Sequence, residues 1–152
     1  MRQKGFTIVE LLIVIVVIGI LAAITIVAYN GIQDRAKFSK IQTDLKSVQK
    51  LIELYKADNG SYPTTPSNGW LYSGTNSTGW VPGIVSTYSS TLPQVADVSG
   101  SSKTYMYKSD GTIYMLMRYY GGGVPAGEWA LVPTDMKQST LTDRYGLYNG
   151  IY

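Results

Sequence analysis

Residues 11–33 form a run of 23 residues without a charged side chain, and this run most constrains the fold of the chain. Its first half, residues 11–21, contains only Leu, Ile and Val apart from Gly19. A helix of about 20 apolar residues is long enough to cross the hydrocarbon core of a bilayer. The sequence therefore predicts a membrane-spanning helix in this part of the chain.

A carboxylate lies at the N-terminal end of this run, because Glu10 immediately precedes residue 11. Insertion scales put the cost of an ionised side chain at the centre of a membrane helix at about 2.5–3.5 kcal/mol, so a functional role is the default hypothesis for such a residue. Glu10 therefore needs a partner, and we expect that partner to carry a positive charge.

Residues 1–5 are basic and end in Gly5, so a charged leader and a small residue both precede the apolar run. An ordinary secretory signal has the opposite order, with its cleavage site after an apolar part that is then discarded. Cleavage between Gly5 and Phe6 would remove the basic residues, keep the apolar run and create an α-amine at Phe6. That amine would lie four positions from Glu10 on one helical face, or opposite the carboxylate of a neighbouring copy in a packed bundle. In either arrangement the two charges offset the cost of each other's burial.

Two stretches near the N-terminus carry a recognisable pattern. Residues 5–14 read Gly-Phe-Thr-Ile-Val-Glu-Leu-Leu-Ile-Val, and residues 18–24 read Ile-Gly-Ile-Leu-Ala-Ala-Ile. Together they resemble the signature of type IV prepilins. The match covers about the first 35 residues and is highly specific. The family includes type IV pilins, the pseudopilins of type II secretion and the competence pilins.

The resemblance implies cleavage after Gly5 by a membrane prepilin peptidase, N-methylation of Phe6 and polymerisation into a helical filament. Glu10 matches the family glutamate that pairs with the N-terminal amine of the adjacent subunit during assembly. The chain departs from the family pattern at Val27, where a proline is usual, so a kink within residues 19–27 is less expected here. The predicted site residues are thus Gly5 and Phe6 for processing, and Phe6 with Glu10 for subunit assembly.

The simplest alternative is a signal anchor that holds some other exported domain, but a plain anchor has no use for Gly5 or Glu10. By the positive-inside rule Arg2 and Lys4 stay in the cytoplasm, so the C-terminal part is exported. We therefore expect a single-pass precursor in the inner (cytoplasmic) membrane that later enters an extracellular pilus. The predicted parts are a leader at 1–5, a hydrophobic transmembrane and polymerisation helix at 6–33, and an amphipathic helix with a globular β-sheet head at 34–152.

The helical pattern continues past the apolar run. Apolar residues recur mostly at steps of three and four, as in a helix with one buried stripe; they are Ile32, Phe38, Ile41, Leu45, Val48, Ile52 and Tyr55. Asn59 and Gly60 then supply a stop, since both accept the left-handed conformation that ends helices. One helix from about residue 6 to 58 is predicted. Its other face carries Asp34, Arg35, Lys37 and Lys40, which are available for intersubunit ion pairs worth about 0–1 kcal/mol each.

Three strands are expected in the C-terminal part. Residues 103–108 and 112–120 are β-formers that flank Asp110-Gly111, which predicts a hairpin. Residues 128–132 predict the third strand.

Two aromatic segments, 70–72 and 80–81, are interpreted as short strands or as plugs that cover the helix. A three-stranded antiparallel sheet is stable when a helix covers one face. We therefore expect an α+β, pilin-like fold in which the long N-terminal helix packs on a small C-terminal antiparallel β-sheet.

The composition excludes most catalytic chemistry. His and Cys are both absent, which rules out Ser-His-Asp triads, thiol nucleophiles, disulfides and imidazole or thiolate metal sites. The acids of the head show no recognisable spacing for hydrolysis; they are Asp97, Asp110, Glu128, Asp135 and Asp143. Residues 135–143 offer only two acids, whereas calcium takes about six to eight oxygen ligands. We expect no cofactor, no metal site and no enzymatic activity.

Three functions are consistent with these features. The first is a structural subunit of a type IV pilus (a fimbrium), a homopolymer handled by the prepilin peptidase and by pilus or secretion assembly machinery. The second is a pseudopilin of a type II secretion system. The resemblance of residues 59–65 to the turn after the long helix of many pseudopilins and some pilins slightly favours the pseudopilin, whereas the two-acid loop at 135–143 and the Gly/Ser/Thr-rich segment up to about residue 102 favour the pilin. The third is a tethered module for cell adhesion or for DNA uptake, as in competence pilins. The formal charge of +3 falls to about +1 without the leader, which argues against a strong nucleic-acid footprint.

The chain has thirteen tyrosines, several of which cluster in its C-terminal part; these are Tyr105, Tyr107, Tyr114, Tyr119, Tyr120, Tyr145, Tyr148 and Tyr152. They can form cross-strand pairs within the sheet, or they can form an adhesive surface on the filament. The triplet Asn76-Ser77-Thr78 fits the N-glycosylation pattern, but we interpret it as plain loop.

Overall fold

The computed structural model describes residues 5–76, 79–95, 103–138 and 140–150, without the side chains of residues 27 and 28. Several residues named above lie outside the described residues: Arg2 and Lys4 of the leader, Ser77 and Thr78 of the glycosylation triplet, Asp97 and Tyr152. The expectations about them remain predictions.

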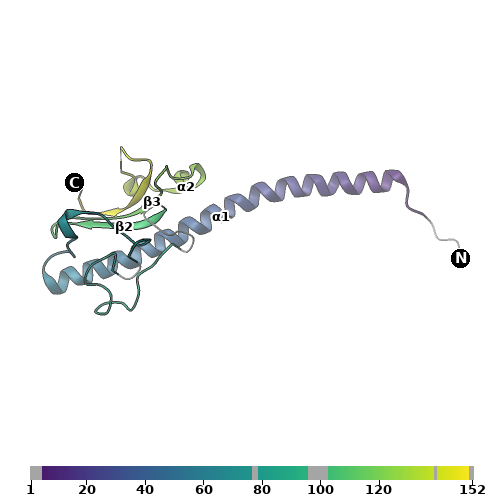
Figure 1. Cartoon of the computed structure of the whole chain (residues 1–152). Coiled ribbons are helices and arrows are strands. Elements are labelled where there is room, and N and C mark those ends of the chain that lie inside the picture. Colours follow the sequence, from purple (N-terminus) through teal and green to yellow (C-terminus); the bar gives the residue numbers. More distant parts are fainter. Residues whose placement is uncertain (1–4, 77–78, 96–102, 139, 151–152) are drawn as a thin grey trace.

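One long helix, α1 (Ile8–Asn59), carries the architecture. Its 52 residues correspond to about 78 Å at 1.5 Å per residue. The N-terminal half projects from the molecule as a bare rod, while the C-terminal half lies against the sheet (Figure 1). The helix ends at Gly60, whose φ of 78° is left-handed and whose N–H donates to the Lys56 carbonyl at 2.8 Å. The predicted helix is confirmed, and it runs without interruption through residues 19–27.

The apolar stripe of α1 builds the core of the head. Leu45, Val48 and Ile52 are each 1% exposed or less, and Phe38 and Ile41 are buried as well. Ile32 was expected in the same stripe, but it is 65% exposed. Ile32 has the predicted helical spacing, but it is not buried because the head does not extend as far along α1 as Ile32.

Four antiparallel strands form one sheet in the order β1-β2-β3-β4. The strands are β1 (Leu71–Tyr72), β2 (Thr104–Ser109), β3 (Tyr114–Tyr119) and β4 (Arg144–Tyr148), and two short 3-10 helices, η1 (Pro66–Asn68) and η2 (Thr134–Met136), lie in the connections. The β2–β3 hairpin is confirmed, with Tyr107 opposite Leu116 and Gly111 at a φ of 95° in the turn. The segment at 70–72 is confirmed as a short strand, β1.

The third strand expected at 128–132 is wrong. These residues belong mostly to a short helix, α2 (Ala126–Leu131), and β4 supplies the strand that pairs with β3. The physical reason is a buried acid: Glu128 accepts hydrogen bonds from the Tyr120 and Tyr145 hydroxyls. Glu128 and Val132 are buried whereas Ala130 between them is exposed. A strand would place all three side chains on one face, but a helix places only the first and the last together.

The segment at 80–81 is a plug rather than a strand. Trp80 and Val81 are 0% and 1% exposed in an irregular turn. The Trp80 ring stacks on Tyr105 with 6.0 Å between the ring centroids. The loop thus covers the core on the side of the helix.

The tyrosines mainly stabilise the two faces of the sheet. On the face toward α1, the tyrosines at 105, 107, 114 and 145 are 1% exposed or less. On the opposite face, half-buried aromatic rings cover three buried methionines; the rings are Trp70, Tyr72, Tyr119 and Tyr148, and the methionines are Met106, Met115 and Met117. The interpretation as aromatic pairing therefore accounts for most of them, as in the contact of Tyr72 with Tyr119.

We expect the head to lose stability as the pH falls below about 4, partly through Asp110. Its Oδ1 accepts hydrogen bonds from the backbone N–H groups of Ile113 (2.9 Å) and Thr112 (2.8 Å), and these bonds hold the pKa of Asp110 below its usual value. Because the pKa is lower in the folded than in the unfolded chain, this contribution is complete above the unfolded pKa and is lost as pH falls through the folded pKa.

The measurement is the urea midpoint at about pH 6 and at about pH 3. Asp110→Asn retains an acceptor oxygen but cannot titrate, so its midpoint should fall less than that of the wild type. Asp135→Asn, the same change in η2, serves as the control and should behave like the wild type. An equal fall for all three chains would contradict the role of Asp110.

Candidate functional site

The apolar half of α1 has no partner within the described part of the chain. The large side chains that the structure describes in this half are about half exposed or more, from 48% at Val17 to 85% at Ile8. This helix is long and apolar enough to cross a membrane, and 0% of its most apolar 18-residue window is buried. A helix satisfies all its backbone hydrogen bonds internally, which is what lipid demands of a spanning segment. The arrangement is that of a membrane anchor joined rigidly to a folded head.

A capping box starts this helix. Thr7 is the N-cap, and its Oγ1 accepts a hydrogen bond from the backbone N–H of Glu10 at 3.3 Å. In return Oε2 of Glu10 accepts from the Thr7 backbone N–H at 2.8 Å and from the Thr7 hydroxyl at 2.7 Å. Two backbone donors that a helix start leaves without partners are thereby satisfied. The Glu10 carboxylate is exposed and folded back over the end of the helix.

The prediction made for Glu10 from the sequence did not include this capping role. The signal was present, because Thr7-x-x-Glu10 before an apolar run is the pattern of a capping box. The hydrogen bonds to Thr7 hold the Glu10 carboxylate near Phe6, because Phe6 directly precedes Thr7 in the chain. A positive charge at the Phe6 nitrogen would be close to this carboxylate, and so would a charge brought by another molecule, because the carboxylate is not covered.

Gly5 and Phe6 precede the helix in exposed chain without regular secondary structure. A Cβ added to Gly5 would meet no described atom within 4 Å, and Gly5 is not among the glycines with positive φ. Phe6 is 86% exposed. The fold itself therefore places no demand on glycine at position 5 and buries nothing at position 6.

The first charged residues after the apolar run lie in the middle of α1. Lys40 pairs with Asp44 one turn later, with 3.0 Å between Nζ and Oδ2, and Asp44 also accepts from the Tyr105 hydroxyl at 2.7 Å. Arg35 and Lys37 are exposed. Of the four residues expected to be available for intersubunit pairs, Lys40 is thus already paired within its own helix.

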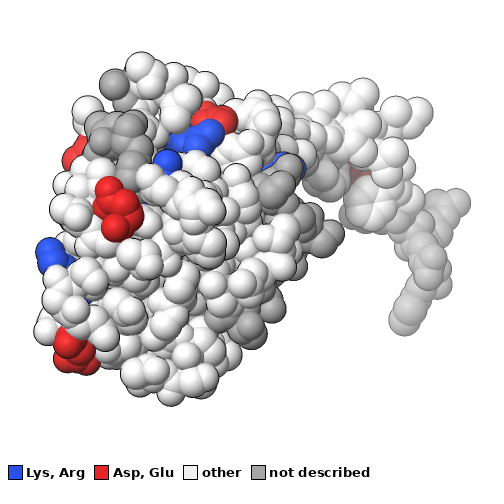
Figure 2. Space-filling model, turned by 60° about the vertical axis from the view of Figure 1, so that its left-hand side comes forward, with Lys and Arg blue, Asp and Glu red and all other residues white. Residues whose placement is uncertain are grey.

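The acids of the head are dispersed by the fold. Asp143 pairs with Arg144 at 2.9 Å, and this guanidinium holds the pKa of Asp143 below its usual range. Asp135 lies in η2, and Glu128 is buried beneath two tyrosines. Within the described ranges, no three His, Cys, Asp or Glu side chains are gathered as a metal site would require. On the face shown in Figure 2, charged side chains are scattered among uncharged ones.

Two family models match the chain. The model described as the prokaryotic N-terminal methylation motif matches residues 1–26. The model described as type II secretion system (T2SS), protein G, matches residues 28–116, which is more than half of the chain. No solved structure matches this chain.

Curated relatives share part of the sequence. The chain is 39% identical over 64 residues to the type II secretion system core protein G of Klebsiella pneumoniae, a stretch that covers 42% of this chain and 46% of that protein. It is 38% identical over 64 residues to the proteins of the same name from Escherichia coli strain K12 and Vibrio cholerae, again with 42% of this chain and 44% of each relative covered. The matched stretch spans less than half the length of each of these relatives.

Proposed function

Because this chain belongs to the type II secretion system protein G family, we propose that it is a pilin-like structural subunit that polymerises through the apolar half of α1. The observation that carries the proposal is the contrast between the two halves of this helix. The C-terminal half is covered by the sheet, whereas the side chains of the N-terminal half are exposed. An apolar surface of this size is stable only in lipid or against other copies of the same helix.

We propose further that a prepilin peptidase cleaves after Gly5 and that Phe6 is then N-methylated. The precursor comprises the leader 1–5, the polymerisation helix 6–33 and the head-bearing part 34–152. The methylation motif at residues 1–26 and the exposed, irregular chain at Gly5 support this order of events. The leader is cytoplasmic and the head is exported.

The amine of Phe6 and the carboxylate of Glu10 form the proposed assembly site. Once the leader is removed, Phe6 carries a positive charge into an apolar bundle, where an unpaired charge is strongly unfavourable. Hydrogen bonds from Thr7 already hold the Glu10 carboxylate at the N-terminal end of the helix. It neutralises the amine of an adjacent subunit, or that of its own chain, as the apolar halves pack together.

Replacing Glu10 should stop filament assembly without stopping membrane insertion or cleavage. Glu10→Leu leaves the amine unpaired in the bundle, and removal of one member of a buried ion pair costs about 3–5 kcal/mol. That corresponds to at least about a hundredfold in the association constant. The measurement is the amount of chain in sheared filaments relative to the processed chain in the membrane.

Glu10→Gln is the matched variant that separates charge from capping. A glutamine can complete a capping box, so the helix start is retained while the negative charge is lost. We expect Glu10→Gln to fail in assembly as Glu10→Leu does. Normal filament yield from Glu10→Leu would refute the assembly site, and normal yield from Glu10→Gln alone would assign Glu10 to helix capping.

The filament is proposed to be a type II secretion pseudopilus, because the protein G model extends over residues 28–116. A type IV pilus on the cell surface is the second candidate, since the curated relatives match only 42% of the chain and the methylation motif serves pili equally well. Mass spectrometry of material sheared from intact cells distinguishes them. Abundant chain that begins at methylated Phe6 would identify a surface pilus, whereas processed chain found only in the envelope would identify the pseudopilus.

A further inference from the structure

A pocket of about 470 Å³ lies between α1, the β2–β3 part of the sheet and the α2 region. We call it the Arg118 pocket. Figure 1 places α2 at the end of the head from which the apolar half of α1 projects. The charged residues that line the pocket are Asp34, Lys37, Lys40, Lys103, Arg118 and Glu128. The volume is within the range of small-molecule sites, about 300–1,000 Å³.

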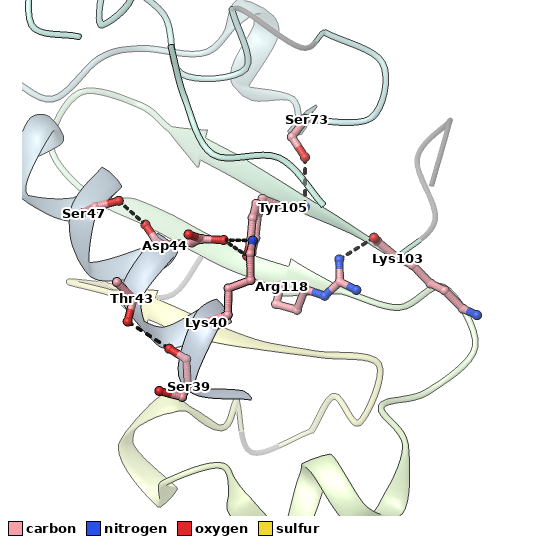
Figure 3. Close-up of polar contacts among 9 residues, drawn as sticks. All are labelled: Ser39, Lys40, Thr43, Asp44, Ser47, Ser73, Lys103, Tyr105 and Arg118. Carbon is pink, nitrogen blue, oxygen red and sulfur yellow. Dashed lines mark hydrogen bonds and ion pairs between the residues drawn. The ribbon is translucent and has the colours of Figure 1, made fainter. Parts of the chain in front are cut away.

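Arg118 is the unusual member of this group. It is only 5% exposed, yet it forms no ion pair within the described part of the chain. One of its terminal nitrogens donates to the Lys103 carbonyl oxygen, while its buried Nε has no hydrogen-bond partner among the described residues. Figure 3 shows its guanidinium reaching toward Lys103 beside Tyr105. Buried arginines are normally paired with an acid.

Two of the described acids near Arg118 are engaged by other groups. Asp44 binds Lys40 and the Tyr105 hydroxyl, as Figure 3 shows. Glu128 accepts from two tyrosine hydroxyls. The third acid, Asp34, lies close to Gly127 of α2 and forms no ion pair within the described ranges.

Among the described lining residues, four cations face two acids, Asp34 and Glu128. Lys37 and Lys103 are exposed, and neither forms an ion pair within the described ranges. Together with Arg118 they offer three cationic groups around one opening. The chemistry of this arrangement suits an anion with several oxygens, because guanidinium and ammonium groups donate hydrogen bonds to phosphate from different directions.

The position of the pocket along α1 indicates the source of such an anion. The uncharged run ends at Gln33, and Lys37 and Lys40 follow within about 10 Å along the helix axis. The headgroup layer outside the hydrocarbon core is about 5–8 Å deep on each side of a bilayer. Lys37 lies about 6 Å past Gln33 along the axis. While α1 spans a membrane, the Lys37 side of the pocket thus lies at the level of the lipid phosphates.

We propose that the Arg118 pocket binds the phosphate of an anionic phospholipid while the chain is anchored in the membrane. Arg118 is the buried anchor of the site, and Lys37 and Lys103 close around the headgroup from α1 and from the start of β2. The proposal rests on the membrane anchoring of the chain and is independent of whether it polymerises.

The test uses the full chain in nanodiscs of phosphatidylcholine with about 30% phosphatidylglycerol. The buffer has an ionic strength of about 0.15 M, at which exposed charges more than about 8 Å apart are largely screened from one another. Native mass spectrometry counts the phosphatidylglycerol that stays bound after release. The wild type should retain one molecule, and the double variant Lys37→Gln/Lys103→Gln should retain at least about tenfold less, a change of 1.4 kcal/mol. Both lysines are exposed, so this variant does not depend on the core for folding.

The matched control is Lys46→Gln/Lys50→Gln, which removes the same charge from exposed positions of α1 outside the pocket. It should retain phosphatidylglycerol like the wild type. Arg118→Gln should abolish retention, with circular dichroism to establish that the head is folded. Equal retention by all variants would overturn the proposal, because it would mean diffuse attraction to the membrane surface.

Two further arms identify the source of the anion. In pure phosphatidylcholine nanodiscs, inorganic phosphate and glycerol phosphate should not be retained at micromolar concentrations; retention there would assign the site to a soluble anion and overturn a lipid site. In the same nanodiscs, a zero-length cross-link from Lys37 or Lys103 to an acid of a second copy would assign the pocket to a subunit contact instead. Retention of the lipid only with an intact pocket supports the proposal. Failure of the wild type to retain the lipid would overturn the lipid site, and it would not affect the proposed filament function.

Discussion

Gly5→Val is expected to leave the chain as an uncleaved precursor in the membrane. The fold tolerates valine at this position, since Gly5 is exposed, lacks a positive φ and has room for a side chain. Any effect must therefore arise outside the folded chain, at the peptidase that we propose reads this residue. The precursor retains two cations, Arg2 and Lys4, next to the apolar run, and their desolvation opposes entry into an apolar bundle. Both processing and filament assembly should be lost.

The measurement is the intact mass of the chain extracted from membranes of cells that contain the peptidase. Wild-type chain should begin at Phe6, and Gly5→Val should begin with the leader. Gly19→Val is the matched control, because a Cβ at Gly19 also meets no described atom within 4 Å, although this glycine lies inside α1. The control should be processed normally. A mature chain that begins at Phe6 in Gly5→Val would refute the assignment of the cleavage site.

Gly146→Ala should be the most damaging small substitution in the head. Gly146 lies in β4 opposite Met117 of β3. A Cβ at this position would overlap the carbonyl oxygen of Leu116 and lie 2.7 Å from Cα of Met117. Both are backbone atoms of the adjacent strand, so neither can move without separating β4 from β3. We expect destabilisation at or above the upper end of the about 1–3 kcal/mol that overpacking usually costs.

The melting temperature of the head should fall by about 10 °C or more, given about 4–8 °C per kcal/mol for a domain of this size. Near-ultraviolet circular dichroism of the full chain in detergent measures it, because the aromatic core reports on the head rather than on the anchor. Gly122→Ala is the control, since this glycine has no described atom within 4 Å of its added Cβ and no positive φ. Melting of Gly146→Ala at the wild-type temperature would contradict the close approach of the two strands.

Local signals in the sequence were reliable guides to the helix and the hairpin. The spacing of Leu45, Val48 and Ile52 predicted which face of α1 is buried, and Asp110-Gly111 predicted the turn. The Thr7 cap could also have been found from its spacing to Glu10. Each of these features depends on residues within about two helical turns of one another, where backbone geometry alone relates the side chains.

The last strand and the pocket depended on contacts between distant residues. Residues 128–132 contain β-formers, but Glu128 is buried in a helix because Tyr120 and Tyr145 supply hydroxyls to its carboxylate. β4 is a strand because its backbone completes the ladder of β3. Hydrogen bonds between strands depend on which segments meet, and no periodicity within a segment encodes that.

The sequence by itself determined that this chain has an apolar anchor, a continuous amphipathic helix and an acid at the helix mouth, because hydropathy and helical spacing are properties of the chain itself. Only the tertiary structure decided that Asp44 is engaged by Lys40 and Tyr105, while Arg118 is buried without an ion pair among the described residues. The reason is that the charge state of a pocket follows from which side chains fold next to each other. Arg118 on β3 and Lys37 on α1 are far apart in the sequence and line one pocket only after the sheet packs on the helix.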